Sequence, residues 1–403
     1  MVDMFNLFAQ WREASPEFLS DYCIIDGYLW SLEQIERMSL EEYAERTIYS
    51  YPVKLYKYFP DVEKDGKNYS IIALESNEVY LSSPCDFDDV FDSEISIPEE
   101  TFWEHRIKTY AKWCKCSINP GMSREDIAQA LLMHIYNTVQ DGGTIENAFD
   151  IEDQEEIIKL QVKLFAQHML LEMMKASDWS IALRNVMGIE YNEFQQDLQQ
   201  KFRVACFTTA PMSQLMWGGS YANEHRGFCL EYNVIMSPEY MDIIHNTRPV
   251  IYSKKRHPVT QALLDAYDRN WDIPAIRDLY LNGALRKSID WAYQNEWRLI
   301  LPPQEHGQRG FTQKFFPISK VYLGNRMSPE RREKIIDICK RKGIPYIGVT
   351  RSADQFEMQE CNILCENCPT FINQKKQTRP KTKEKMKIKI EATLEVSYGV
   401  DGK

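Results

Sequence analysis

The sequence predicts an α+β fold: a mixed, largely antiparallel sheet with a large helical insertion and a helical N-terminal extension. Short strand-like segments flank a long helical region, and two of the last such segments enclose a helix in β-α-β order. This order of elements favours an α+β protein over a doubly wound fold. At 403 residues and 44% hydrophobic, the chain can bury a large core as one elaborated domain or two.

We expect three regions along the chain. Residues 1–51 have a helical pattern, and Ser39 stands three residues before Glu42, which predicts a capping box at the start of a helix. Residues 52–350 form the core α+β domain, with the helical insertion at about 99–202. Residues 351–403 form a C-terminal extension that contains a basic tail.

Alternating or continuous apolar runs mark the strands of the core domain. The runs that we expect to form strands are VKLYKYF, EVYLSS, FRVACFTT, GFCLEYNV, KVYLG and PYIGV. Ser328 and Pro329 have the chemistry of a helix start, and Gly343 has that of a helix end. The helix between them joins the last two strands.

The formal net charge of −11 is unevenly distributed. Eight lysines and arginines against one glutamate give residues 375–389 a charge of +7 and leave −18 on the rest. An acidic body is a poor general binder of nucleic acid, because lysine and arginine supply most of the non-specific affinity for phosphates. The tail is either a solvated terminus, which we favour, or a weak nucleic-acid contact.

Neither a secretory leader nor an apolar run of about 20 residues is evident, so we expect a cytoplasmic protein that does not contact a membrane. The ten scattered cysteines favour reduced thiols. Cys361, Cys365 and Cys368 have a spacing found in iron–sulfur proteins. Only 35 residues follow them and no fourth ligand is nearby, so we expect no metal there.

An acidic turn follows the second predicted strand, with four aspartates at positions 86, 88, 89 and 92. Their oxygens could bind a divalent cation. Aspartates also favour turns by bonding their own backbone, and Phe87 and Phe91 would anchor such a turn on the core. We favour the turn interpretation. The chain contains no G-x-S-x-G, Walker A, G-x-G-x-x-G or H-E-x-x-H motif.

The stretch WAYQNEWRLIL, residues 291–301, has a period of two. As a strand it places Gln294, Glu296 and Arg298 on one face and an apolar set that includes Trp297 on the other. A glutamate in such an apolar strand has either a chemical role or a simple ion pair with Arg298 on a half-exposed surface.

Several separated blocks resemble a bacterial family of domains of unknown function, family 2971. They are LYKYF, VYLSSPCDFDDVFD, CFTTAPMSQLMWGGSYANEHRGFCLEY, VIY, LRKSIDWAYQNEWRLIL and KVYLG, in conserved order between Val53 and Val349. The chain departs from the family pattern in two places. The usual Asn-Asp-Pro-Phe-Asp is the DDVFD of residues 88–92, and a usual glutamate is Gln294.

The same blocks are remotely similar to the ADP-ribosyltransferases, in which an Arg or His, a Ser-Thr-Ser-like run and a Gln/Glu-x-Glu motif lie on three successive strands. The corresponding residues are Lys57, Thr208 with Thr209, and Gln294 with Glu296. Lys57 departs from the Arg or His of that pattern.

This resemblance implies an NAD-dependent ADP-ribosyltransferase or NAD glycohydrolase, with an effector, toxin or defence role as one setting. It implies that Glu296 stabilises an oxocarbenium-like transition state and that Gln294 reaches the ribose or the acceptor. Lys57, Thr208 and Thr209 would contact NAD or brace Glu296, and three tyrosines would stack on its rings: Tyr56, Tyr221 and Tyr293. The acceptor, protein, nucleic acid or small molecule, stays open. The alternative is a catalytically silent module of the same fold that binds protein or nucleic acid.

Overall fold

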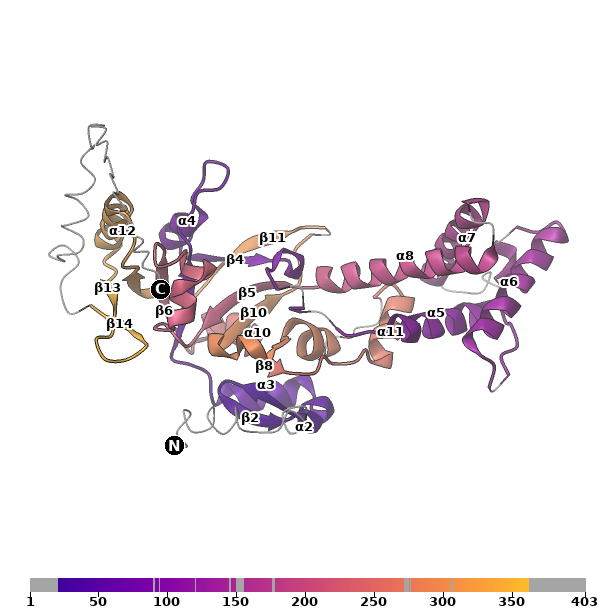
Figure 1. The fold of residues 1–403 in the computed structure, drawn as a ribbon, viewed down its shortest axis with the longest axis horizontal. Helices are drawn as coiled ribbons and strands as arrows, with labels where there is room; N and C mark the ends of the chain where they lie inside the picture. Colours follow the sequence, from indigo (N-terminus) through magenta and orange to yellow (C-terminus); the bar gives the residue numbers. More distant parts are fainter. Residues whose placement is uncertain are drawn as a thin grey trace, which may run out of the picture.

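The computed structural model describes residues 21–361 except 90, 94, 120, 145, 150–155, 176–177, 272–274, 276 and 306. The molecule is elongated, with a sheet region in the middle and a long helical arm extending from one side of it (Figure 1). The cysteine pair at 365 and 368 and the basic tail lie outside the described residues. None of the described helices combines the length and apolar composition that crossing a bilayer requires.

The larger sheet has ten strands and is mostly antiparallel, which confirms the predicted class of sheet. Its strand order is β11-β4-β5-β3-β6-β12-β13-β14, and β10 pairs with both β5 and β7. The strands are β3 (Lys54–Phe59), β4 (Glu78–Ser82), β5 (Arg203–Thr208), β6 (Phe228–Asn233), β7 (Thr247–Pro249), β10 (Glu296–Leu301), β11 (Gly310–Lys314), β12 (Ile318–Leu323), β13 (Tyr346–Arg351) and β14 (Met358–Glu360).

The largest apolar cluster packs on one face of this sheet, under α4 (Tyr69–Ser76), α10 (Met241–Asn246) and α12 (Pro329–Lys342). It includes Leu55, Phe207, Leu230, Trp297 and Leu299, each at most 3% exposed. The predicted β-α-β unit is β12-α12-β13, whose strands pair in parallel. Ser328 caps the start of α12 through its hydroxyl, and Gly343 ends the helix with φ = 66°.

The N-terminal region is less helical than expected. β1 (Tyr22–Ile25) and β2 (Tyr28–Ser31) form a hairpin, and only then follow α2 (Leu32–Arg37) and α3 (Leu40–Ile48). The reason is the turn sequence Asp26-Gly27, both with positive φ, because such a pair supports the tight turn that right-twisted strands require. The hairpin joins β8 (Ile251–Ser253) and β9 (Arg286–Ser288) in a second, four-stranded sheet. Ser39 caps the start of α3 by accepting from the backbone N–H of Glu42, which is one half of the predicted capping box, while the Glu42 carboxylate pairs with Arg46.

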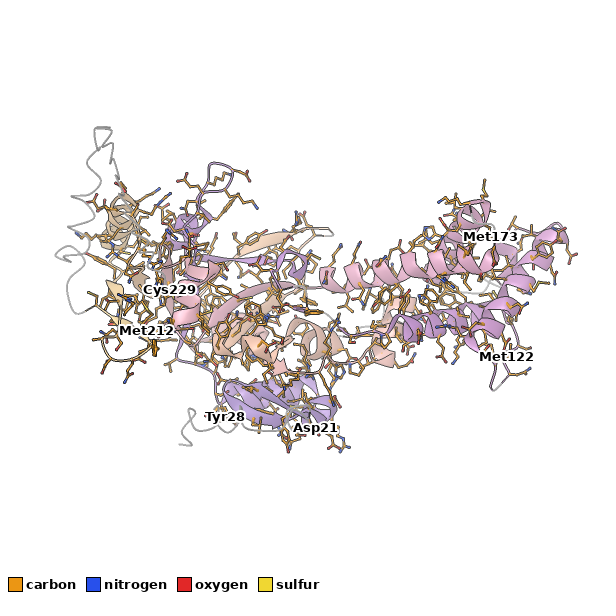
Figure 2. All side chains as sticks on the ribbon, in the orientation of Figure 1. Asp21, Tyr28, Met122, Met173, Met212 and Cys229 are labelled. Atoms are coloured by element: carbon orange, nitrogen blue, oxygen red, sulfur yellow. The ribbon has the colours of Figure 1, made fainter. Side chains whose placement is uncertain are left out.

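The helical insertion consists of α5 (Glu99–Trp113), α6 (Arg124–Gln140), α7 (Glu156–Lys175) and α8 (Trp179–Gln200). These helices form the arm in Figure 1 and have an apolar core of their own, which includes Tyr110, Phe149 and Phe165. Met122 and Met173 lie toward the far end of the arm (Figure 2). Near the sheet, Phe102 and Phe194 of the arm pack on α11 (Gln261–Asp268), so a second apolar cluster joins the arm to the rest of the protein.

Candidate functional site

A cavity of about 290 Å³ lies where β3 and β5 separate. In the described residues these two strands share a single register pair, Tyr56 with Thr208, and beyond it they diverge. We call this space the site cavity. It is lined by Tyr56, Lys57, Tyr58, Tyr80, Ser82, Asp86, Phe87, Asp88, Asp89, Asp92, Val204, Cys206, Phe207, Thr208, Met216, Tyr221, Lys287, Trp291, Gln294 and Glu296. Six of the eight site residues that the resemblance to the ADP-ribosyltransferases implies therefore line one cavity.

Lys57 connects the two diverging strands. Its ammonium donates to the carbonyl oxygen of Cys206 on β5 at 2.9 Å and lies over the ring of Phe207 at 5.5 Å. The side chain thus replaces one of the backbone hydrogen bonds that the strands do not make. Burial lowers the pKa of Lys57, and the neighbouring Cys206 and Glu296 oppose that shift.

Glu296 begins β10 and is held from both sides by cations. Its Oε1 accepts from Nε of Arg298 at 2.7 Å, and its Oε2 accepts from Nζ of Lys287 at 2.8 Å. Asp92 accepts from Nη2 of Arg298 at 2.6 Å and lies 3.1 Å from Nζ of Lys287. These four residues form a closed cluster of two acids and two bases, which we call the charge cluster.

The charge cluster is buried, so the interpretation of Glu296 and Arg298 as a half-exposed surface pair is wrong. Glu296 is 4% exposed, Asp92 is 4% exposed and Arg298 is 0% exposed. Trp297 and Leu299 pack in the apolar core, as the alternation of the sequence predicts. An apolar core accepts charges only when they are paired and hydrogen bonded, which explains why the four groups occur together.

Electrostatics keep Glu296 ionised. Burial by itself would raise the pKa of Glu296, but Arg298 and Lys287 outweigh burial and lower the pKa well below its ordinary value. Burial by itself would lower the pKa of Lys287, but the carboxylates of Glu296 and Asp92 outweigh burial and raise the pKa above its ordinary value. The backbone N–H of Glu296 also donates to the hydroxyl of Tyr252 at 2.9 Å. The carboxylate is therefore a fixed negative charge facing the site cavity.

Gln294 reaches the site cavity by a different route from the one predicted. It ends a 3₁₀ helix, Ile289–Gln294, and Asn295 in the left-handed region (φ = 43°) turns the chain into β10. Gln294 is therefore not on the strand, and the two-residue spacing does not place it beside Glu296. Instead the ammonium of Lys287 donates to Oε1 of Gln294 at 2.9 Å, and Nε2 of Gln294 donates to the hydroxyl of Tyr221. These two bonds orient the amide of Gln294.

Thr208 braces the backbone that carries Gln294. Its hydroxyl donates to the carbonyl oxygen of Gln294 at 2.5 Å and accepts from the backbone N–H of Ala210 at 2.9 Å. Both hydrogen-bonding roles of this buried hydroxyl are used inside the protein. Thr208 thus acts on the site through Gln294, and a ligand that accepts a hydrogen bond from this hydroxyl would have to displace the carbonyl of Gln294.

The remaining predicted residues are divided between the site cavity and its surroundings. Tyr56 and Tyr221 line the site cavity, and burial raises the pKa of Tyr221 to about 12, so its phenol is neutral at physiological pH. Thr209 and Tyr293 do not line it. Thr209 donates its backbone N–H to Asn295, and Tyr293 packs beside the ring of Trp291.

Sequence reasoning missed Lys287 as a member of the site. It lies on β9, whose pairing with β8 brings a third segment of chain to the site cavity. The short run RKS has no apolar alternation, and the available signal was that Lys287 stands inside the block LRKSIDWAYQNEWRLIL that resembles family 2971.

The acidic turn contributes to the site in two ways. Asp92 belongs to the charge cluster, while Asp86, Asp88 and Asp89 line the site cavity. Asp89 accepts from the backbone N–H of Phe91, as the turn interpretation expects. Phe91 does not anchor the turn, however: it is 58% exposed and lies under the guanidinium of Arg256.

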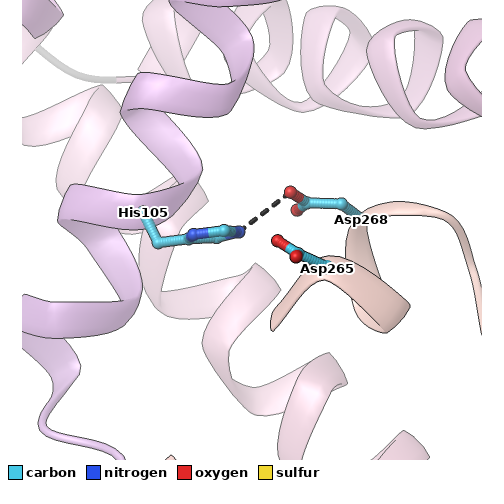
Figure 3. A group of neighbouring side chains, drawn as sticks. All are labelled: His105, Asp265 and Asp268. Carbon is cyan, nitrogen blue, oxygen red and sulfur yellow. Dashed lines mark hydrogen bonds and ion pairs between the residues drawn. The ribbon is translucent and has the colours of Figure 1, made fainter. Parts of the chain in front are cut away.

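A second group of polar side chains lies in the arm, where His105 faces Asp265 and Asp268 of α11 (Figure 3). His105 Nε2 lies 2.8 Å from Asp268, which also accepts from Arg106 and from Thr109. Gln261 donates to Asp265 at 2.7 Å. Because a cation and several donors already occupy these oxygens, the group works as a partly buried ionic junction between the arm and α11.

The fold and the site define an α+β protein with a charged cavity at the junction of its two sheets. Residues 216–299 match the model of a family described as protein of unknown function (DUF2971). That range contains Tyr221, Lys287, Gln294 and Glu296. No curated protein and no solved structure matches the chain.

Proposed function

We propose that this chain is an NAD-dependent ADP-ribosyltransferase-like enzyme whose chemistry takes place in the site cavity. The observation that carries the proposal is the position of Glu296, an ionised and immobilised carboxylate on the wall of a cavity that Tyr56, Lys57 and Tyr221 also line. A fixed negative charge favours a reaction in which positive charge develops next to it.

The chemistry follows from that charge. When the bond between the ribose carbon C1′ and the nicotinamide nitrogen breaks, nicotinamide leaves with the electron pair and the ribose becomes oxocarbenium-like. The carboxylate of Glu296 would stabilise this cation. A nucleophile then forms a bond to C1′ and loses its proton. Water as the nucleophile gives NAD hydrolysis, and a side chain or a base gives transfer.

Gln294 and Tyr221 would position the ribose or the acceptor. The amide of Gln294 is fixed by Lys287 and by the tyrosine hydroxyl, so it presents a set orientation to anything that enters the site cavity. Rigid polar groups of this kind contribute by holding the reacting atoms in place. Thr208 supports the arrangement by holding the carbonyl of Gln294.

One observation favours the second candidate, a catalytically silent binding module. Both oxygens of Glu296 already have a cation partner, and the charge cluster of two acids and two bases is neutral as a whole. Neutralisation weakens the field that Glu296 exerts on a ligand. Lys57 stands in place of the Arg or His of the transferases, and this departure also favours the binding module.

The test is release of nicotinamide from NAD by the full chain, with and without cell lysate as a source of acceptors. We expect Glu296→Gln to lower turnover by about a hundredfold or more while NAD still raises the melting temperature. Because this change also unbalances the charge cluster, Glu296→Asp serves beside it: it keeps the charge and the fold but moves the carboxylate. Background release by the wild type under all conditions, with no thermal shift from NAD, would favour the binding module.

A further inference from the structure

A second, smaller cavity adjoins the site cavity and has the opposite charge. Its volume is about 230 Å³. It is lined by Phe91, Ser253, Lys254, Lys255, Arg256, Arg286, Lys287 and Ser288. Five of these eight residues are lysine or arginine, and none is acidic. We call this space the basic cavity. Lys287 lines both cavities, so the two spaces meet at that side chain.

The fold assembles the basic cavity from the ends of two parallel strands. β8 and β9 pair in parallel with Ser253 opposite Ser288, so the carboxyl ends of both strands lie side by side. The chain continues from β8 directly into Lys254, Lys255 and Arg256. Two hydroxyls and a run of cations are thereby brought to one edge of the smaller sheet.

One cation at this edge has a donor nitrogen whose hydrogen-bonding capacity is not used. Arg286 is 5% exposed, and its Nη2 is buried without a hydrogen-bond partner among the described residues. Its Nε donates to the carbonyl of Leu281, which brings no negative charge. Burying a polar nitrogen without a partner is unfavourable. The exposed Lys255 lies 3.7 Å from the exposed Asp21, an ion pair of little strength.

The contrast between the two cavities separates the parts of a dinucleotide. Asp88 and Asp89 in the lining of the site cavity would repel a phosphate, whereas Lys254, Lys255 and Arg286 attract one. The basic cavity is smaller than the space of about 300–1,000 Å³ that a drug-sized molecule requires, so its size suits a group and not a whole cofactor. Arginine and lysine are the usual partners of phosphate oxygens.

We propose that the basic cavity binds the pyrophosphate of NAD while the nicotinamide riboside occupies the site cavity, with Lys287 at the boundary. Assigning the pyrophosphate to NAD rests on the proposed function. The binding of a pyrophosphate group to the basic cavity stands independently of it.

The experiment is calorimetric titration of the full chain with inorganic pyrophosphate, ADP-ribose and nicotinamide, in a buffer with EDTA so that no divalent cation bridges the acidic turn. The test variant is Lys254→Gln/Lys255→Gln, which changes two exposed side chains. The matched control is Lys64→Gln/Lys67→Gln, which removes the same charge from two exposed lysines elsewhere. We expect the test variant to weaken pyrophosphate and ADP-ribose at least tenfold and to leave nicotinamide unchanged, and the control to bind all three like the wild type.

The outcomes separate this inference from the proposed function. Suppose that the wild type releases no nicotinamide but binds pyrophosphate and ADP-ribose, and that the test variant loses this binding. The assignment of the basic cavity is then supported, while the proposed enzyme function fails. Nicotinamide release that is unaffected in the test variant, with unchanged ADP-ribose affinity, overturns the basic cavity and leaves the enzyme standing. Absence of pyrophosphate binding in the wild type, or equal weakening in both variants, also overturns it.

Discussion

Glu296 Oε1 and Arg298 Nε, two residues apart on β10, lie 2.7 Å from each other, with Arg298 fully buried and Glu296 only 4% exposed. Removing Arg298 would leave two carboxylates, Glu296 and Asp92, with Lys287 alone. We expect Arg298→Met to lower the free energy of unfolding by about 3–5 kcal/mol, because it leaves buried charge unpaired. The measurement is urea denaturation followed by tryptophan fluorescence.

Arg46→Met is the matched control for that change. Arg46 also pairs with a glutamate, Glu42, but both side chains are nearly half exposed. Water screens such a pair, and we expect its loss to change the free energy of unfolding by less than about 1 kcal/mol. Equal effects of the two variants would show that the charge cluster does not depend on burial.

The buried hydroxyl of Thr208 allows a test of how the site is braced. Thr208→Val keeps the shape of the side chain but removes both of its hydrogen bonds, to Gln294 and from Ala210. We expect a loss of about 1–3 kcal/mol in the free energy of unfolding, and Thr208→Ser should restore most of it. If the enzyme proposal holds, turnover should follow the same order. A serine variant as unstable as the valine variant would mean that packing, and not the hydroxyl, matters.

Asp26 predicts a specific dependence of stability on pH. Burial raises the pKa of Asp26 to about 6, above its ordinary value of 3.8, although the indole N–H of Trp297 donates to it. A raised carboxyl pKa means that folding favours the protonated form, so this contribution is complete below about pH 4 and is lost as the pH rises through about 6. Ionised Asp26 then destabilises the fold at pH 7.5 by about 1–3 kcal/mol.

Asp26→Asn should therefore raise the melting temperature at pH 7.5 and leave it nearly unchanged at pH 4. Asparagine keeps an acceptor for Trp297 and tolerates the positive φ of this position. Asp65→Asn is the control, since Asp65 has a similar φ of 52° but is exposed. An effect of Asp26→Asn that is the same at both pH values would contradict ionisation as its cause.

Two glycines are expected to respond in opposite directions to alanine. A Cβ on Gly227 would lie 2.0 Å from the carbonyl oxygen of Phe59, so Gly227→Ala must move β3 or β6 and should cost several kcal/mol or prevent folding. Gly188 lies within α8, and a Cβ there meets nothing within 4 Å. Gly188→Ala should stabilise the protein by about 0.5–1 kcal/mol, which a melting curve can detect. Stabilisation by both changes would contradict the tight approach of β3 and β6.

The sequence allowed the longer strands of the core sheet, the helical insertion and the convergence of six candidate residues to be predicted, because these depend on local pattern. The alternation in residues 296–301 placed Glu296 and Arg298 on one face, and the order of motifs brought Lys57, Thr208 and Glu296 together. The site residues that could not be predicted from the sequence reach the site cavity through pairing between distant segments. Lys287 reaches the site cavity because β9 pairs with β8, and the residue pattern of 286–288 does not predict that pairing.

Backbone turns account for the other differences. The Asp26-Gly27 pair was a readable hairpin signal that the helical interpretation of residues 1–51 overlooked. The left-handed conformation of Asn295 could not be predicted from the sequence, since asparagine adopts that conformation only where the neighbouring chain requires it. It separates Gln294 from β10 and gives it a position that no regular strand could offer.

The way the arm leaves and rejoins the sheet bears on the order in which the protein folds. The chain departs after β4 and returns at β5, and Ser82 pairs with Val204, so the roughly 120 residues between them form a loop whose two ends touch. Closing so long a flexible loop is entropically unfavourable. Once α5 to α8 have packed around their own apolar core, the two stems are already close together and the remaining closure involves few residues. The pairing of β4 with β5 should accordingly form late, after the helices that are furthest from it.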